Sequence, residues 1–294
     1  MEFFHLSIEV LFLISELLDQ SSLLSLYLTS RQAREIAIYV LWKTLSQNHI
    51  SSLHWSLVHR RLGLAETFVN KYKVNINTKY KGETPLICAC RLGFVEGLEW
   101  LMKHKDLDVG SCDANGRNAL WWAADNIRHT KSVELLIKHE DTNLNCQDTK
   151  NGTTPLILSI MYNSFEILEL LLSDPRTDTN TVDHHGQSPL HHAVYRDNPQ
   201  IIELLAQSTA TNINSRDNER QTPLILADKW RSPRATRSLL SIPAVEAELV
   251  DIRGSTALCY AVEDGDNEIV QQLLERTSGV HNCRNEACNK TLFN

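Results

Sequence analysis

The stretch HHGQSPLHHA, residues 184–193, places four histidines within nine positions of the chain. Imidazole nitrogens are common metal ligands and common general acids and bases, so the cluster could hold a metal ion or transfer protons. The alternative is that these histidines are structural or simply exposed. The choice depends on whether the local secondary structure lets the four rings converge, and therefore on the organisation of the whole chain.

A repeated pattern surrounds the histidines and extends over most of the sequence. Segments such as GETPL, GTTPL and GQSPL recur at 33 to 36 residues, as shown by Leu53, Leu86, Leu120, Leu156, Leu190, Leu224, Leu258 and Leu292. In each unit a turn precedes a Thr, Ser or Asn that can cap a helix, often followed by Pro, which suits the first helical position. A short apolar helix and a second helix with apolar residues at helical spacing follow. The sequence therefore predicts a stack of two-helix repeats.

These units resemble ankyrin repeats, in which a turn and two helices recur about every 33 residues with the motif TPLHxA. The resemblance implies an all-α ankyrin-repeat solenoid over residues 50–294, with about seven repeats and a partial eighth. The expected repeats are 50–81, 82–115, 116–151, 152–185, 186–219, 220–253, 254–287 and the partial 288–294. The motif histidine occurs at His54 and His191. Four units carry an acid in the turn, at Asp113, Asp183, Asp217 and Asp251, and two units lack it.

The repeat pattern separates the four histidines. The resemblance implies that His191 bonds the capping hydroxyl of Ser188, while His192 is expected to point toward the repeat stack. His184 and His185 are expected at the exposed tip of a turn, so no metal site is expected in this stretch. The pair Cys283 and Cys288 lacks further zinc ligands nearby. Neither a metal nor another cofactor is therefore expected.

Catalytic motifs are also missing from the sequence. HExxH, GxSxG, GxGxxG and GxxxxGK[ST] do not occur. A stack of repeats offers a long surface rather than a closed pocket that excludes water. We therefore do not expect an enzyme.

The resemblance implies a concave surface that binds a protein partner through turn tips and the exposed side of each first helix. The residues at these positions are Tyr80, Lys81, Arg91, Asn115, Arg117, Asp125, Tyr162, His184, His185, Tyr195, Arg196, Lys229, Trp230 and Arg253. Tyr162, Tyr195 and Trp230 are interpreted as equivalent positions in three successive units, and exposed aromatic residues often anchor partners. The segment DKWRSPRATR adds a group of basic residues in an acidic chain, which are either part of this surface or merely solubilising. The pair Trp121 and Trp122 is interpreted mainly as core.

The first fifty residues do not fit the repeat and are predicted to form three helices, at 7–19, 21–29 and 31–46. This segment resembles an F-box, with the loose pattern LPxEILxxIxxxLxxxxLxxLxxTxR and a later LW. The matching residues are Leu6, Glu9, Val10, Leu11, Ile14, Leu17, Leu23, Leu26, Thr29, Arg31, Leu41 and Trp42. Ser7 stands where the pattern has Pro. We expect a small three-helix F-box-like domain at 1–49, before the repeats at 50–294.

The F-box resemblance implies a role in ubiquitin transfer. It implies that the F-box-like domain, called the head below, binds a Skp-type adaptor. The adaptor would link the chain to a cullin–RING ubiquitin ligase. The residues expected to contact the adaptor are Leu6, Glu9, Val10, Leu13, Ile14 and Leu17. The repeats would then hold a substrate, and the chain itself would only raise effective concentration. The alternative is an ankyrin scaffold or regulatory protein without a ligase, whose N-terminal helices cap the repeats.

Charge and hydropathy limit the partners and the location. The formal net charge of −7 argues against a nucleic-acid or membrane-surface binder, which would carry basic patches. The N-terminus lacks a basic start, and Glu2, Glu9 and Glu16 interrupt its apolar run, unlike a secretory signal. No run of about twenty apolar residues could span a membrane. We expect an intracellular protein, cytoplasmic or nuclear, that is a monomer apart from its complexes.

Overall fold

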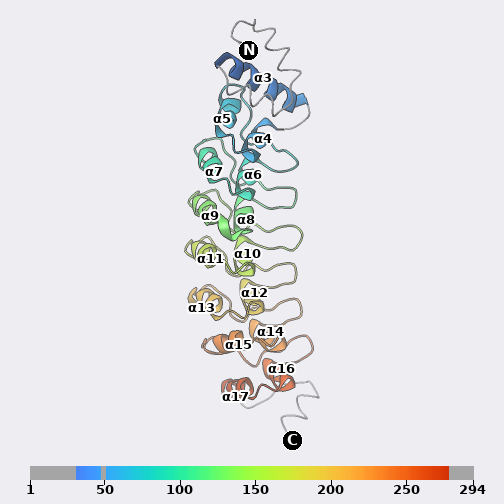
Figure 1. The fold of residues 1–294 in the computed structure, drawn as a ribbon. Coiled ribbons are helices and arrows are strands. Elements are labelled where there is room, and N and C mark those ends of the chain that lie inside the picture. The colour runs from blue at the N-terminus through green and yellow to red at the C-terminus, as the bar shows by residue number, and fades with distance from the viewer. Residues whose placement is uncertain (1–30, 48–50, 278–294) are drawn as a thin grey trace. The chain divides into compact units, whose positions relative to one another are not determined.

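The computed structural model describes residues 31–47 and 51–277, in which short helices alternate with turns and loops (Figure 1). Within these ranges there is no strand, and one isolated bridge joins Tyr80 to Glu83. The predicted helices at 7–19 and 21–29, with the six residues expected to contact an adaptor, lie outside the described residues. The chain divides into two compact units, residues 1–114 and 115–294, called the first and second units below.

The described part of the first unit contains one long helix and two helix pairs. The long helix α3 (Arg31–Gln47) confirms the helix predicted at 31–46. The pairs are α4 (Ser52–Val58) with α5 (Leu62–Asn70), and α6 (Pro85–Arg91) with α7 (Val95–Leu101).

The helix α3 is attached to the first repeat by an apolar cluster. Ile38, Leu41 and Leu45 of α3 form this cluster with Leu64 and Phe68 of α5. Leu45 and Phe68 are fully buried. Burial of apolar side chains is the main stabilising contribution to such a contact. The third predicted helix of the head therefore packs directly on the repeat that follows it.

Residues 115–277 of the second unit contain five helix pairs. They are α8 (Ala119–Ala124) with α9 (Thr130–Ile137), α10 (Pro155–Met161) with α11 (Phe165–Leu172), α12 (Pro189–Tyr195) with α13 (Pro199–Gln207), α14 (Pro223–Lys229) with α15 (Pro233–Leu240), and α16 (Ala257–Asp264) with α17 (Asn267–Arg276). A short 3₁₀ turn, η2 (Ile127–His129), precedes α9. Figure 1 shows the first helices of these pairs in one row and the second helices in another. Because helices this short are marginal alone, packing on neighbours must supply their stability.

The helix starts form as the sequence predicts. Thr154 and Thr222 accept hydrogen bonds from the amides of Ile157 and Ile225 at 3.2 Å, and each precedes a proline at the first helical position. A side-chain cap satisfies an amide that the first turn leaves without an intrahelical partner. The capping Thr-Pro pair therefore fixes where each first helix begins.

Backbone hydrogen bonds between successive turns join the repeats of the second unit. The amide of His184 donates to the carbonyl of Asn151 at 2.8 Å, and the amide of Asn218 donates to the carbonyl of His185 at 3.0 Å. Gly152, with φ of +74°, lies so near that a β-carbon would be 2.9 Å from the His184 amide nitrogen. The close approach of two backbones therefore requires glycine at this turn.

A buried acid organises two of these turns, and one of these acids, Asp148, was missed in the sequence. The carboxylate of Asp148 accepts from the amide of Thr153 at 2.7 Å and from its hydroxyl at 2.6 Å. Asp183 plays the same part by accepting from the amides of His185 and Gln187 at 2.9 Å. The prediction that the turn at Gly152 lacks an acid was wrong, because Asp148 supplies it. Asp148 lies four residues before the turn glycine rather than three, because its turn is one residue longer.

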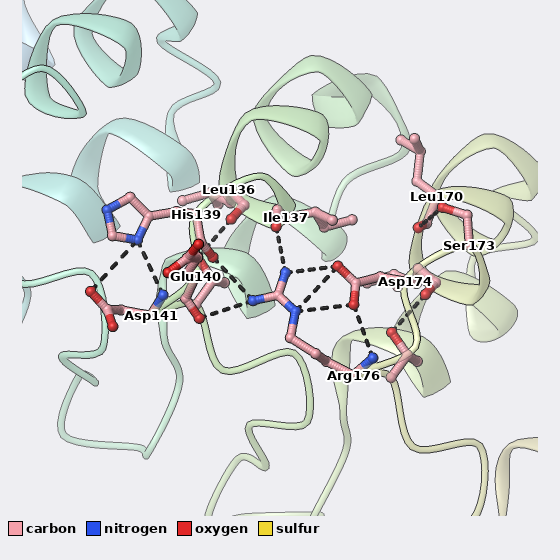
Figure 2. Close-up of polar contacts among 12 residues, drawn as sticks. Leu136, Ile137, His139, Glu140, Asp141, Leu170, Ser173, Asp174 and Arg176 are labelled. Carbon is pink, nitrogen blue, oxygen red and sulfur yellow. Dashed lines mark hydrogen bonds and ion pairs between the residues drawn. The ribbon is translucent and has the colours of Figure 1, made fainter.

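An arginine from one repeat caps the second helix of the repeat before it (Figure 2). The guanidinium of Arg176 donates to the carbonyls of Ile137 and Glu140, at 2.5 and 2.9 Å, where α9 ends. The carboxylate of Asp174 holds it in place at 2.7 Å. Arg276 repeats the arrangement by donating to the carbonyl of Ile242 at 2.9 Å. Carbonyls that a helix end leaves without partners are thus satisfied by the next repeat.

Candidate protein-binding surface

Three exposed aromatic residues lie at the ends of successive first helices in the second unit. Tyr162, Tyr195 and Trp230 are 47%, 41% and 59% exposed. The rings of Tyr195 and Trp230 pack edge to face, with 5.7 Å between their centroids. The prediction that all three positions are equivalent was wrong for Tyr195. Tyr162 and Trp230 are the residues after α10 and α14, whereas Tyr195 is the last residue of α12.

Hydrogen bonds fix the two tyrosine rings. The Tyr162 hydroxyl donates to Asp125 Oδ1 at 3.1 Å, and Gln187 Nε2 donates to the Tyr195 hydroxyl at 2.7 Å. Burial, followed by the Asp125 carboxylate, raises the pKa of Tyr162 above its usual value, so its phenol stays neutral and can donate. A ring held in this way loses little freedom when a partner covers it. Gln187 was not among the predicted site residues.

The basic segment does not form a patch of unpaired charge. Lys229 pairs with Glu219 at 3.2 Å, Arg231 with Asp264 at 2.5 Å, and Arg237 with Glu268 at 2.9 Å. Of its predicted cations, only Arg234 is exposed without an acidic partner among the described residues. The acids come from neighbouring turns and helices, which the spacing of the basic residues alone does not reveal.

The histidines of the opening stretch separate as predicted, with one exception. His191 is fully buried; its Nδ1 lies 2.8 Å from Ser188 Oγ, and its Nε2 donates to the Gln221 carbonyl at 3.0 Å. Burial lowers the pKa of His191, which keeps the ring neutral. His184 and His185 are exposed. The exception is His192, whose Nε2 lies 2.9 Å from the carboxylate of Asp183 instead of facing only the repeat stack.

A tryptophan takes over the inter-repeat bond of the motif histidine. His54 Nε2 donates to the Glu83 carbonyl at 3.0 Å, in the first unit. Trp121 Nε1 donates at 3.0 Å to the Thr153 carbonyl, which occupies the same place before a capping threonine. Trp121 is buried, as predicted. Trp122 is partly buried, and the Arg117 guanidinium lies 4.1 Å from the centre of the Trp122 ring.

The other predicted contact residues divide between the two units. In the first unit, Tyr80, Lys81 and Arg91 line a cavity of about 310 Å³ together with Trp55. The Lys81 ammonium lies 5.4 Å from the centre of the Tyr80 ring, and Arg91 pairs with Glu83 at 3.0 Å. The exposed predicted residues of the second unit include Asn115, Arg196 and Arg253, whereas Asp125 is half-buried.

The described ranges carry neither a metal-binding cluster nor a membrane-spanning helix. No group of three His, Cys, Asp or Glu side chains in residues 31–47 and 51–277 is arranged to hold a metal ion. No helix there is both long and apolar enough to cross a bilayer.

Family models match most of the repeat region. A model described as ankyrin repeats in three copies matches residues 53–148 and 131–217, and a single ankyrin-repeat model matches residues 253–286. The chain belongs to the ankyrin-repeat family. Ankyrin repeats bind protein partners through their extended surface and are typically non-catalytic.

Individual relatives share parts of this region. The chain is 27% identical to palmitoyltransferase AKR1 of Lachancea kluyveri over 42% of its length, and 32% identical to mouse and human rabankyrin-5 over 36%. The aligned parts are 22% and 9% of those much longer proteins. The crystal structure of the ankyrin repeat domain of Bcl-3 superposes with a TM-score of 0.67, covering 76% of this chain and 97% of that domain. At 21% identity this likeness shows the ankyrin fold alone.

Proposed function

We propose that the chain is a non-catalytic adaptor that holds a protein partner on its second unit against Tyr195 and Trp230. The observation that carries this proposal is the edge-to-face contact of two rings that remain 41% and 59% exposed. Large aromatic side chains left open to solvent are unusual on a surface without a partner and are typical binding anchors. Tyr162 extends the anchor row along the neighbouring repeat.

The double variant Tyr195→Ala/Trp230→Ala is expected to lose its partner. Anchors of this kind typically contribute 2 kcal/mol or more each, so affinity should fall by roughly a hundredfold or more. Affinity purification of the tagged parent chain from cells, followed by mass spectrometry, identifies the partner, and titration calorimetry with that purified partner measures the change in Kd.

The matched control for this experiment is Leu274→Ala, which removes an exposed apolar side chain from the second helix α17. Leu274 is 39% exposed, close to the value for Tyr195. The control should bind the partner as the parent chain does. If the double variant bound the partner as tightly as the parent chain does, Tyr195 and Trp230 would not be part of the interface.

We further propose that the partner is a substrate of a cullin–RING ubiquitin ligase and that the N-terminal segment recruits the Skp-type adaptor. The support is the F-box-like pattern from Leu6 to Trp42, together with a helix at Arg31–Gln47 where that pattern requires one. The alternative is an ankyrin scaffold whose N-terminal helices only cap the repeats. The packing of α3 on Leu64 and Phe68 favours this capping role for α3.

Adaptor binding separates these two functions. The purified full chain is expected to retain a Skp-type adaptor on a gel-filtration column, and Ile14→Glu or Leu17→Glu should abolish the complex because each places a charge in an apolar contact. Val58→Glu is the control, because Val58 is 50% exposed on α4 and accepts a charge without burial. A folded parent chain that retains no adaptor would favour the scaffold.

We infer an intracellular location and a border near residue 49 between the F-box-like head and the repeats. The support for the location is the acidic, interrupted N-terminal sequence. The support for the border is the start of the repeat spacing at Leu53.

A further inference from the structure

A small cavity in the second unit lies among the last two described helix pairs. It has a volume of about 110 Å³ and is lined by side chains from α14, α15, α16 and α17 and from their connections. Part of its wall is apolar, from Ala227, Pro233, Ala261 and Ile269. The polar part of its lining includes Asp228 of α14.

The carboxyl group of Asp228 is only half satisfied. Its side chain is almost completely buried, with 5% exposed. Oδ1 accepts a hydrogen bond from the Thr236 hydroxyl at 2.8 Å, whereas Oδ2 is buried and has no hydrogen-bond partner among the described residues. A buried polar atom without a partner destabilises the folded state by about 1–3 kcal/mol, and more when it is charged. A donor that reached Oδ2 through the cavity would remove this penalty.

The other charged groups around the cavity leave it negative. Asp264 pairs with Arg231 at 2.5 Å. The Asp266 carboxylate caps α17 by accepting from the Ile269 amide at 3.2 Å. With Asp228 ionised, three carboxylates face one guanidinium. Burial, and then the proximity of Asp266 and Asp264, raise the pKa of Asp228 to about 7. A cation that enters would favour the ionised form.

The shape and chemistry of the cavity select one kind of cation. A metal ion is excluded, because no group of described ligands there is arranged to hold one. A guanidinium is a planar fork that prefers two acceptor oxygens, whereas Asp228 offers only Oδ2. An ammonium group on a methylene stem needs one strong acceptor and an apolar wall. The volume is well below the roughly 300 Å³ at which drug-sized ligand sites begin, and suits a single side chain.

We propose that this cavity receives a lysine side chain of a protein partner, with the ammonium group donating to Asp228 Oδ2 and the methylenes against Ala261 and Ile269. This inference rests on the proposed function, since the lysine must be brought by a bound protein. It adds to that function a second anchor of different chemistry, separate from the aromatic row of Tyr195 and Trp230.

The test uses n-butylammonium, which has the stem and head of a lysine side chain, and the full chain with labelled alanine and isoleucine methyl groups. We expect saturable NMR shifts of the Ala261 and Ile269 methyl groups, and none with n-butanol, which has the same stem without the charge. Binding should be about tenfold weaker at pH 6 than at pH 8, because Asp228 must be ionised. The absence of saturable shifts with n-butylammonium would overturn the proposal.

Three variants complete the test. Asp228→Asn keeps the shape and is expected to abolish binding, and equal binding by this variant would overturn the proposal. Asp141→Asn removes an acid whose side chain is 84% exposed and should bind as the parent chain does. Arg231→Gln removes the cation of the cavity itself. If only this variant bound n-butylammonium, the Arg231 side chain itself would occupy the cavity in the parent chain, and the lysine proposal would fail.

The proposed function and the lysine cavity can fail separately. Partner capture that is equal for the parent chain and Asp228→Asn would overturn the lysine contact and leave the adaptor function intact. Binding of n-butylammonium by a chain that captures no partner would overturn the adaptor function alone, because the probe needs no bound protein.

Discussion

Asp228→Asn is expected to stabilise the second unit at pH 8 by up to about 4 kcal/mol and to leave its stability nearly unchanged at pH 4. Burial raises the pKa of Asp228 from 3.8 to about 7, so the folded chain keeps this proton up to about pH 7. The unfolded chain loses it near pH 3.8. Between these values the unfolded state binds fewer protons, and stability therefore falls as pH rises. Asparagine is neutral at every pH and can still accept from Thr236.

Urea unfolding at pH 4, 6 and 8, followed by circular dichroism, measures this effect. The gap between the variant and the parent chain should grow from pH 4 to pH 7 and then level off. Asp141→Asn is the matched control, because its exposed carboxyl should give the same unfolding midpoint as the parent chain at each pH. A constant gap between Asp228→Asn and the parent chain would show that the Asp228 carboxyl is ionised in the folded state throughout.

The features predicted correctly from the sequence are those decided within a few residues. The Thr-Pro pairs place the helix starts at Pro155 and Pro223, because the cap and the fixed backbone of proline act locally. The bond between His191 and Ser188 spans three residues and follows from the same motif. The repeat spacing then fixes the order of the helices.

The features that were missed depend on small shifts in spacing or on contacts between repeats. One extra residue in a turn hid the role of Asp148. Tyr195 lies one residue nearer its helix start than Tyr162 and Trp230 do, in a helix of the same length, so Arg196 takes their position. The acids that pair with Arg231 and Arg237 lie 33 and 31 residues away in sequence, so no local pattern indicates them. Only the packing of one repeat on the next brings these charges together.

Asp228 did carry a signal in the sequence. In the segment PLILADK it lies four residues after Leu224, and residues at this spacing share one face of a helix. Leu224 occupies the motif position that is buried in every described repeat, so the same face had to bury the acid. An ionisable group on a core face either pairs, shifts its pKa or awaits a ligand. Its burial was therefore predictable, whereas the cavity beside it required the structure.

Phe68→Ala is expected to destabilise the first unit by about 3–5 kcal/mol and to release α3 from the repeat that follows it. The Phe68 side chain is fully buried and belongs to the cluster with Ile38, Leu41 and Leu45 of α3. Alanine would leave a cavity under all three. Hydrogen exchange followed by mass spectrometry should show faster exchange of the amides in residues 31–47.

The control Val58→Ala removes methyl groups from a side chain that is 50% exposed and should not change exchange of α3. Unchanged exchange of residues 31–47 in folded Phe68→Ala would mean that the cluster does not hold α3. If α3 is released and adaptor capture persists, the N-terminal segment recruits the adaptor without docking on the repeats. If both are lost together, α3 links the two, because the same helix that completes the predicted head also covers the apolar end of the first repeat.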